Sequence, residues 1–426
     1  MQGIRLPKYK KISTIKAVNT YNKPKVVYIP LISQADTDIT ALVKKGDYVY
    51  KGTIVGKSKG NLRIPIHASI SGNVLDFEEK TYLNGLKVKC VVIENDFKEK
   101  IEKRNNIKKE IDGYTKEEFI ETIKEAGIVG LGGGGFPTYV KYSSNEKITT
   151  LIINAVECEP YITADYMLLT TKCEEVLEAI DAIIDINNID EAIIAIKKGN
   201  VALKDHINNF IGTYLKIKLV EVPNFYPMGW ERNLVKFVTG ETYVKLPMEK
   251  GVVVNNASTI YAIYEALKFD RPLTERIITF TGEMLKEPQN VLVKLGTPIS
   301  EIIEFLGGYT DLSNIKFVAG GPMMGVSLPN DELVATSNLN CVLVLKQGLN
   351  DPTSECLRCG KCIAACPAKL SPVLIKDNIK NINRLRELEP LRCIECGLCS
   401  YICPAKITVR EFVKTAKLEV LKEGIR

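Results

Sequence analysis

Short apolar runs separated by turn residues dominate the first hundred residues of the chain. Residues 26–29 (Val-Val-Tyr-Ile) and 53–56 (Thr-Ile-Val-Gly) are two such runs, and both are flanked by polar or turn-forming residues. Apolar and β-branched runs of this length, bounded by turn signals, predict strands rather than helices. We therefore expect a β domain over residues 1–105.

Two phrases within this region are more specific. Residues 43–52 (Val-Lys-Lys-Gly-Asp-Tyr-Val-Tyr-Lys-Gly) and 66–74 (Ile-His-Ala-Ser-Ile-Ser-Gly-Asn-Val) resemble the two facing halves of a biotinyl/lipoyl-like barrel-sandwich module. The carrier version of that module displays a lysine at a hairpin tip for covalent attachment. Residues 57–63 between the two phrases contain no Met-Lys-Met tip. We expect a structural β module, and the alternative is a swinging arm.

A change of pattern marks the next boundary. Residues 98–113 carry mixed charge and few apolar side chains, which predicts a solvated linker. Thr115 and Glu118 then form a capping-box pattern, in which each side chain satisfies a backbone amide at the start of a helix. Phe119, Ile120 and Ile123 supply the buried face of that helix. Gly127 suits the left-handed position that ends it.

Strands and helices alternate over the following residues, 106–270. Residues 150–153, 192–196, 216–220 and 252–254 are short apolar runs that predict strands. Residues 176–186 and 203–211, and a segment ending at Leu267, have the periodicity of amphipathic helices. This alternation predicts an α/β domain with a parallel sheet.

The pattern changes again after Pro272. Strand-like runs at 276–281, 291–295 and 316–319 surround a short helical segment at 299–306, which suggests a β-grasp domain over residues 271–346. Residues 347–426 contain most of the cysteines and close with a charged helical segment at 409–423. The predicted fold class is therefore multidomain α/β and α+β.

The composition limits the function classes. The chain has 426 residues, 45% of them hydrophobic, with 57 basic and 51 acidic residues and a net charge of +6. Both signs are interspersed, so no block predicts a nucleic-acid interface. The first residues lack the apolar core of a signal peptide, and no run of about 18 apolar residues is present. We expect a reduced, cytoplasmic setting with any membrane association peripheral.

The cysteine spacing is the strongest chemical signal in the chain. Two runs share the pattern Cys-x2-Cys-x2-Cys-x3-Cys-Pro. The predicted ligands of the first run are Cys356, Cys359, Cys362 and Cys366, and those of the second are Cys393, Cys396, Cys399 and Cys403. This run holds [4Fe–4S] clusters in bacterial ferredoxins, where the fourth cysteine binds the other cluster. A zinc site is the alternative, but zinc needs four ligands and usually takes two separated pairs.

The crossed pattern predicts two ligand sets. Cys403 joins the first three cysteines of the first run, and Cys366 joins the first three of the second. Each set would hold one [4Fe–4S] cluster. The remaining four cysteines and the two histidines have no ligand spacing.

A glycine-rich loop is the second informative stretch. Residues 127–141 read Gly-Ile-Val-Gly-Leu-Gly-Gly-Gly-Gly-Phe-Pro-Thr-Tyr-Val-Lys. Consecutive glycines allow backbone amides to approach a ligand closely, and such amides with Lys141 suit a phosphate. An ordinary dinucleotide fingerprint follows a strand. This loop is predicted to follow a helix, so that fingerprint is disfavoured.

Several phrases together identify a family resemblance. Gly-Phe-Pro-Thr at 135–138 and Asn-Ala-Val-Glu-Cys-Glu-Pro-Tyr at 154–161 resemble the flavin- and NADH-binding subunit of respiratory complex I. With Tyr-Pro-Met-Gly-Trp-Glu at 226–231, Gly-Gly-Pro-Met-Met-Gly at 320–325 and the two cysteine runs, the whole chain resembles the RnfC family of the Rnf electron transport complex. The resemblance extends over essentially the full length, in order.

The resemblance implies cofactors and residue roles. It implies two [4Fe–4S] clusters, an FMN and NAD(H) as the exchange partner. The implied cofactor-binding residues lie in the stretch 127–141, at and after the strand 150–153, near residue 230 and after the strand 252–254: Gly130, Gly132, Gly133, Gly135, Lys141, Asn154, Glu157, Glu159, Gly229, Glu231 and Asn256. For the polar members, alternatives remain open. Glu157 or Glu159 would serve as a helix-start carboxylate, and Asn256 as an ordinary N-cap.

Some positions depart from the family pattern. Leu131 stands where complex I relatives carry Arg, and Val156 where they carry Asp. Trp230 stands where RnfC proteins usually have a small or acidic residue, and its indole would narrow a nucleotide groove. These departures leave room for a soluble paralogue, such as the carrier associated with proline reductase.

The resemblance therefore implies an NADH/ferredoxin oxidoreductase subunit of a translocase-type complex. FMN would exchange hydride with NAD(H), and the clusters would pass single electrons to or from a ferredoxin-like partner. Membrane-embedded subunits would be further partners, with the chain peripheral on the inner face of the cell membrane. The alternatives are a soluble carrier that delivers NADH electrons to a catabolic reductase, and a polyferredoxin adaptor without bound flavin.

Overall fold

Two small antiparallel sheets form the first part of the chain in the computed structural model, which describes residues 3–33, 38–58, 60, 62, 64–101, 110–111, 113–144, 146–348 and 352–424. One sheet has the order β2 (Val26–Pro30), β8 (Lys87–Asn95), β7 (Gly72–Thr81), β4 (Tyr48–Val49). The other has the order β3 (Ile39–Ala41), β5 (Ile54–Ser58), β6 (Pro65–His67). Val27, Val55 and Ile93 are buried between them, which confirms the barrel-sandwich prediction.

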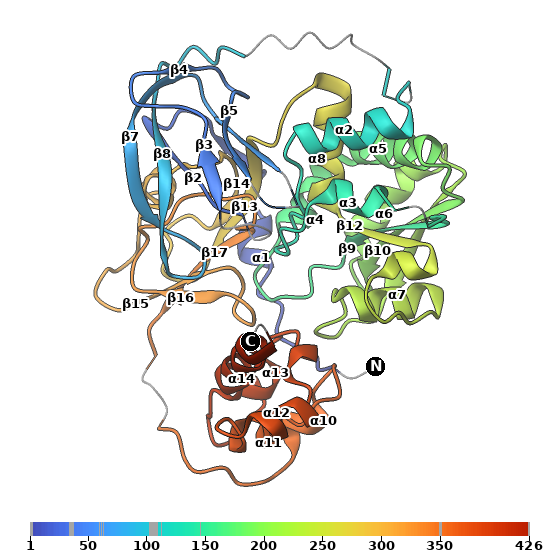
Figure 1. The fold of residues 1–426 in the computed structure, drawn as a ribbon, viewed down its shortest axis with the longest axis vertical. Helices are drawn as coiled ribbons and strands as arrows, with labels where there is room; N and C mark the ends of the chain where they lie inside the picture. Colours follow the sequence, from blue (N-terminus) through green and yellow to red (C-terminus); the bar gives the residue numbers. More distant parts are fainter. Residues whose placement is uncertain are drawn as a thin grey trace.

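A four-stranded parallel sheet forms the second part (Figure 1). Its order is β11 (Ile217–Val222), β10 (Glu191–Lys197), β9 (Thr150–Ala155), β12 (Val252–Asn256). The surrounding helices are α2 (Lys116–Glu125), α3 (Thr138–Tyr142), α4 (Ala164–Thr171), α5 (Cys173–Ile186), α6 (Val201–Ile211), α7 (Glu231–Thr239) and α8 (Ala257–Phe269), with a 3₁₀ turn η1 (Pro247–Lys250). The predicted α/β alternation is confirmed.

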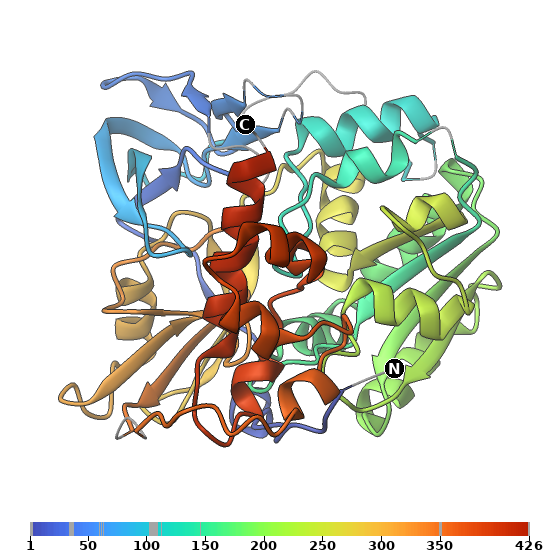
Figure 2. The same ribbon diagram turned by 60° about the horizontal axis from the view of Figure 1, so that its bottom comes forward.

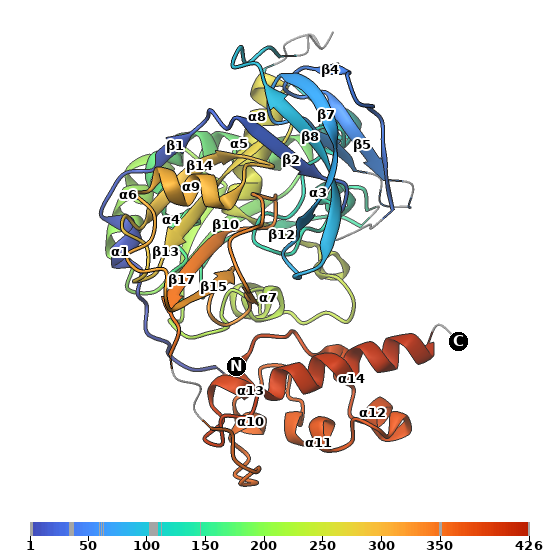
Figure 3. The ribbon, with the colours of Figure 1, turned by 90° about the vertical axis from the view of Figure 1, so that its left-hand side faces the viewer.

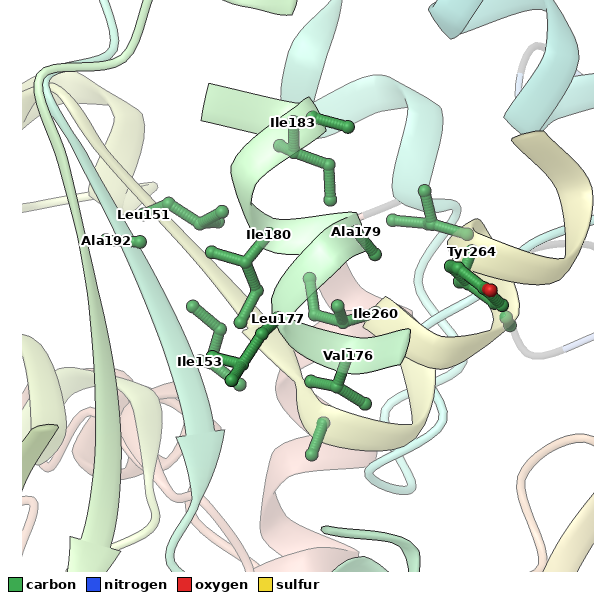
Figure 4. Packing of buried hydrophobic residues seen from close by; sticks show 14 of the residues in the cluster. Leu151, Ile153, Val176, Leu177, Ala179, Ile180, Ile183, Ala192, Ile260 and Tyr264 are labelled. Atoms are coloured by element: carbon green, nitrogen blue, oxygen red, sulfur yellow. The ribbon is translucent and has the colours of Figure 1, made fainter. Parts of the chain in front are cut away.

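The helices cover both faces of this sheet because its strands are apolar on both sides. Figure 4 shows α5 packed between β9 and α8, with Leu177 and Ile180 close to the sheet. Ile152 and Val254 point to the opposite face, into a second cluster with Leu234 of α7. The helix α5 begins at Cys173, three residues before the predicted start. Cys173 is buried, so it extends the same apolar face by one turn.

The capping box predicted for α2 is present. The Glu118 amide donates to Thr115 Oγ1 at 3.2 Å, and the Thr115 amide donates to Glu118 Oε2 at 2.9 Å. Gly127 follows the helix with φ of +69°, the left-handed conformation expected there. These local contacts fix the direction in which the chain leaves α2, and the glycine loop begins at that point.

A six-stranded mixed sheet forms the third part, in the order β1 (Asn19–Tyr21), β14 (Gln289–Lys294), β13 (Glu275–Thr281), β17 (Cys341–Lys346), β15 (Ile315–Ala319), β16 (Val326–Leu328). Helix α9 (Ile299–Phe305) packs on it, as a β-grasp arrangement requires. Strand β1 comes from the N-terminal segment and pairs in parallel with β14. The short helix α1 (Lys11–Thr14) precedes it. Thus parts of the segment between residues 4 and 21 pack against the later domains, beyond the barrel-sandwich.

The cysteine-rich part consists of short helices and loops packed on one long helix. The elements are α10 (Lys361–Ala364), α11 (Pro372–Asp377), α12 (Ile382–Glu387), η2 (Pro390–Arg392), α13 (Leu398–Tyr401) and α14 (Val409–Gly424). Figure 2 shows this part lying across the junction of the α/β and β-grasp parts, and Figure 3 shows it as a separate layer beneath them. Among the described residues, no helix combines the length and apolar composition needed to cross a membrane.

The domain boundaries stay predictions. The boundary at 105/106, the centre of the predicted linker and residues 59, 61 and 63 of the predicted hairpin tip lie outside the described residues.

Candidate functional site

A large cavity, of about 970 Å³, lies at the carboxyl ends of β9 and β12. From β9 the sheet continues to β10 and β11 on one side and to β12 on the other, so the strand order reverses between β9 and β12. Ligands of open α/β sheets bind at such a switch point. Asn154 and Asn256 are paired in register at these strand ends, and both line the cavity.

The glycine loop forms one wall of the cavity. The Gly130 amide donates to Phe136 O at 2.8 Å, and the Gly135 amide donates to Gly130 O at 2.9 Å, which folds the loop back on itself. Gly133 has φ of +105°, a conformation that favours glycine. The amides of Gly132, Gly133 and Gly134 donate no hydrogen bond to any of the described residues. Three consecutive free amides form a cradle for an anion.

A side chain at Gly132 would crowd Asn256 at the end of β12. A Cβ placed there would lie 3.3 Å from Cβ of Asn256. The absence of a side chain therefore allows the loop to approach β12 closely, as the sequence pattern predicts for a loop that presents its backbone to a ligand.

Lys141 supplies a positive charge on the same side of the cavity. It lies on α3, directly after the loop, and its Nζ donates to Val254 O at 2.6 Å and to Asn255 Oδ1 at 3.3 Å. Burial lowers the pKa of Lys141, while the nearby Glu231 carboxylate raises it. The side chain reaches the cavity but already has two protein acceptors, so one ammonium hydrogen is left for a ligand.

Asn154 and Asn256 each have protein partners. Asn154 Nδ2 donates to Gly229 O at 2.8 Å. Asn256 Oδ1 accepts from the Ser258 amide, so Asn256 is the N-cap of α8, which was the alternative for this residue. Its Nδ2 donates to Asp165 Oδ2 at 2.5 Å. Asn256 can cap α8 and also line the cavity, because it lies at the end of β12, which borders the cavity.

Glu157 is a helix-start carboxylate, as its alternative proposed. Its Oε1 accepts from the Asp165 amide at 2.9 Å and its Oε2 from the Tyr166 amide at 3.3 Å, at the beginning of α4. Lys10 Nζ lies 3.5 Å from Oε2. Glu157 has φ of +38°, which is uncommon for a residue with a side chain. Burial raises its pKa to about 7, against the opposing effect of Lys10.

Glu159 connects the α/β part to the β-grasp part. Its two carboxylate oxygens accept from the Met323 and Met324 amides, both at 2.9 Å. A Cβ at Gly321 would lie 2.2 Å from Glu159 Oε2, so the glycine permits this contact. Burial raises the pKa of Glu159 to about 7, while the two amides, Arg410 and Lys10 oppose the rise. Burial also raises the pKa of Asp165, so the cavity wall holds three carboxyl groups with raised pKa values.

The raised pKa of Glu159 predicts a pH-dependent stability. A carboxyl whose pKa is higher in the folded chain than in the unfolded chain stabilises the fold at low pH, and this contribution is lost as pH rises from about 4.5 to about 7. We expect Tm of the wild type to fall relative to that of Glu159→Gln between pH 5.5 and pH 8, measured by anaerobic thermal unfolding. Glu241→Gln, at an exposed carboxylate, is the control. Parallel curves for wild type and Glu159→Gln would contradict this assignment.

Gly229, Trp230 and Glu231 border the cavity where α7 begins. A Cβ at Gly229 would lie 3.2 Å from Cys158 Sγ. Glu231 Oε1 accepts from Tyr243 OH at 2.8 Å. Trp230 is half-buried, lines the cavity and also packs on the core of the cysteine-rich part. Part of the indole surface is thus used at a domain junction.

The eight cysteines of the two runs lie in two separate groups. One small cavity is lined by Cys356, Cys359, Cys362 and Cys403, and another by Cys366, Cys393, Cys396 and Cys399. These are the two crossed sets that the spacing predicts. Apolar side chains border both cavities, with Ile407 and Val409 at the first and Leu398 and Val413 at the second. Charged residues also line them: Arg358, Lys361 and Lys376 at the first, and Glu395 and Arg410 at the second. Four thiols around a small cavity fit a [4Fe–4S] cluster.

Cys396 connects the two kinds of site. It lines the second cysteine group and also, with Ile394, the large cavity. Tyr226 OH donates to Cys396 O at 2.7 Å, and Arg410 Nη1 donates to Met323 O at 3.1 Å. We call the group containing Cys396 the proximal group and the other the distal group. Cys359 of the distal group is exposed.

Some residues of the cavity wall were not predicted from the sequence. Arg276 on β13, Asp165 on α4, and Ile394 and Cys396 all line it. Asp165 lies four residues after the phrase at 154–161 that carries the family resemblance, which was a usable signal. The only sequence signal at Arg276 is a charged residue within an apolar strand. The local sequence pattern does not indicate which cavity such a side chain enters.

Two relatives from ion-translocating complexes are similar to this chain over most of its length. Both are the C components of ferredoxin:NAD(+) oxidoreductase complexes. The proton-translocating one of Clostridium ljungdahlii is 33% identical over 380 residues, covering 88% of this chain and 82% of the relative. The Na(+)-translocating one of Acetobacterium woodii is 33% identical, covering 87% and 85%. The chain belongs to the RnfC family. Its predicted family resemblance is thereby confirmed.

Family models match each part of this RnfC chain. The RnfC barrel sandwich hybrid domain matches residues 1–98, and the Nuo51 FMN-binding domain matches residues 123–265. The SLBB domain matches residues 277–327, and the 4Fe-4S dicluster domain matches residues 355–407. These matches confirm the predicted fold class, and they support FMN and two [4Fe–4S] clusters as the cofactors.

A solved structure shares the fold. The structure of an NAD+-reducing [NiFe]-hydrogenase in the H2-reduced state superposes with a TM-score of 0.50 at 16% identity, covering 74% of this chain and 65% of that one. At this identity the similarity concerns the fold alone.

Proposed function

We propose that this RnfC chain is the flavo-iron–sulfur electron-transfer subunit of an ion-translocating ferredoxin:NAD+ oxidoreductase. Electrons would move between NAD(H) and a ferredoxin-like partner through FMN, the proximal group and the distal group, in that order. When bound, FMN supplies the exchange between hydride transfer and single-electron transfer. The protein binds and orients the cofactors.

The observation that carries this proposal is the shared wall at Cys396. The residue borders both the large cavity and the proximal cysteine group, so a flavin and a cluster bound there would be neighbours. The distal group lies farther along the same domain, with Cys359 at the surface. A carrier that receives electrons in a buried cavity and delivers them to another protein needs the flavin inside, the proximal group next to it and the distal group near the surface.

The residues that we propose to bind FMN are those of the cavity wall. The amides of Gly132 and Gly133, in the loop between Gly130 and Gly135, would receive the phosphate with Lys141. Asn154, Glu157, Glu159 and Asn256 would line the flavin, with Gly229 and Glu231 toward the flavin or the nicotinamide nucleotide. The cavity volume of about 970 Å³ suits a ligand of this size.

The cellular setting is also a proposal. Membrane-embedded and ferredoxin-like subunits of an Rnf-type complex are the partners we propose, with this chain peripheral on the inner face of the cell membrane. The alternative is a soluble carrier that delivers NADH electrons to a catabolic reductase such as proline reductase. Recovery of the chain with membrane subunits in an affinity purification supports the complex, and recovery with a soluble reductase supports the alternative.

Anaerobic purification tests the proposal directly. We expect about eight irons and one FMN for each chain. Addition of NADH should bleach the flavin absorbance, and cluster signals should then appear in electron paramagnetic resonance spectra. A colourless protein with zinc in the cysteine groups would contradict the electron-transfer role, and flavin that NADH does not bleach would contradict the proposed donor.

A further inference from the structure

Arg276 is a buried cation that enters the large cavity from another domain. It lies on β13 of the β-grasp part, its exposed fraction is 4%, and it lines the cavity beside Leu131 and Asp165. None of the residues that we propose above to bind FMN belongs to the β-grasp part. The proposed FMN-binding residues therefore do not account for a guanidinium at this position.

The hydrogen bonds of Arg276 join two loops. Nη2 donates to Leu131 O at 3.2 Å, within the glycine loop. Nη1 donates to Ser337 O, in the loop that precedes β17. Nε donates to Ile277 O at 3.3 Å. A planar guanidinium can reach both loops at once, whereas an ammonium has no such fork.

The hydrogen bond from Arg276 to Leu131 O holds the glycine loop at the residue before its free amides. Leu131 directly precedes the three free amides of Gly132, Gly133 and Gly134. Its own amide donates to Thr259 Oγ1 at 2.9 Å on α8. Both backbone polar atoms of Leu131 are thus held, one by α8 and the other by Arg276. The direction in which the next amides point depends on this arrangement.

The positive charge of Arg276 also contributes to the electrostatics of the cavity. Within the part of the chain that the structure describes, the charged side chains of the wall are four carboxyl groups and two cations, namely Glu157, Glu159, Asp165, Glu231, Lys141 and Arg276. Burial lowers the pKa of Arg276 to about 10, and Asp165 raises it, so the guanidinium is protonated at neutral pH. In a buried site, a fixed positive charge interacts strongly with charge that develops on a ligand.

We propose that Arg276 is a positioning residue of the flavin site. Through Leu131 it holds the glycine loop in the form that presents its amides, and its charge favours the reduced flavin, which carries more negative charge than the oxidised flavin. This inference rests on the proposed function. It assigns to the β-grasp domain a direct part in setting the affinity and the redox potential of the flavin.

Three variants test the proposal: Arg276→Gln, Arg276→Lys and the control Lys294→Gln. Lys294 is similarly buried on the neighbouring strand β14, but it pairs with Glu99 and does not line the cavity. Kd for FMN and the flavin midpoint potential are measured on each, with iron content and circular dichroism on the same preparations. We expect both Arg276 variants to bind FMN about tenfold more weakly, as loss of a charge-assisted hydrogen bond predicts.

The flavin midpoint potential distinguishes the effect of the Arg276 charge from the effect of the position of the glycine loop. In Arg276→Gln the reduced flavin should lose about tenfold more affinity than the oxidised flavin, which lowers the potential by about 30 mV for a two-electron couple. Arg276→Lys should keep the wild-type potential, because it keeps the charge. Lys294→Gln should change neither quantity.

Three results would overturn the proposal. The first is wild-type affinity and potential in Arg276→Gln. The second is weakened FMN binding with an unchanged potential, which a merely destabilised loop would produce. The third is an equal loss in Lys294→Gln. A wild-type protein that binds no FMN at all would instead reject the proposed function, so the two failures are distinguishable.

Discussion

Replacing Cys396 with alanine is expected to disconnect the flavin from the rest of the electron path. The variant should retain FMN and its bleaching by NADH, but reduction of an added ferredoxin should fall by at least about a hundredfold. The physical reason is that Cys396 belongs to the proximal group and borders the cavity, so loss of its thiolate removes the first cluster beyond the flavin. Iron content should fall to about four for each chain.

Cys359→Ala is the matched control for this experiment. Cys359 is an exposed member of the distal group. Its loss should also leave about four irons, but NADH should still reduce the proximal cluster, which electron paramagnetic resonance can detect. Ferredoxin reduction at the wild-type rate in Cys396→Ala would contradict the proposed order. So would a proximal signal that disappears in Cys359→Ala while the iron stays at about four.

Replacing Lys141 with methionine is expected to weaken FMN binding with little effect on the protein without flavin. A charge-assisted hydrogen bond contributes about 1.5–3 kcal/mol, so Kd should rise by roughly 10- to 150-fold. The ammonium is buried, and its removal relieves a desolvation cost while leaving Val254 O and Asn255 Oδ1 without that donor. These two effects oppose each other in the flavin-free protein.

Thermal unfolding with and without added FMN measures this effect. Wild type should show a rise in Tm that grows with FMN concentration, since a ligand that binds the folded state stabilises it. Lys141→Met should lose most of that rise. Lys294→Met, which removes a buried lysine outside the cavity wall, should keep it. An equal rise in Tm for Lys141→Met and wild type would exclude a role for this lysine in FMN binding.

The N-terminal segment has a role that its sequence did not indicate. Ile4 pairs with Tyr226, and Ile4 and Leu6 pack with Met323 and Leu398 where three parts of the chain meet. Lys10 Nζ donates to Glu157 O at 2.9 Å and to Ile162 O at 2.6 Å. The N-terminal segment therefore contacts both the cavity wall and the residues packed beside the proximal group. Its few apolar residues have no periodicity, so no local pattern predicts this packing.

The sequence by itself determined the features that depend on neighbouring residues. The cysteine spacing predicted the three thiols that each run contributes to one group, because a short loop limits where successive side chains can point, and the ferredoxin pattern supplied the fourth thiol from the other run. The alternation of apolar runs predicted the parallel sheet, and the Thr115 and Glu118 pair predicted a helix start, because these patterns report local hydrogen bonding and burial. The glycine loop was also recognisable, since its conformation depends on its own residues.

Only the tertiary structure decided which distant segments share the cavity. Arg276 reaches Leu131 across 145 positions, and Tyr226 reaches Cys396 across 170. Glu157 proved to hold the start of α4, and Glu159 to hold the loop at Met323. Such contacts follow from how whole domains pack, and a single charged or polar residue in a strand or loop carries no information about its partner. The sequence thus predicted the parts of the proposed electron path, and the packing of the domains decided which residues lie side by side.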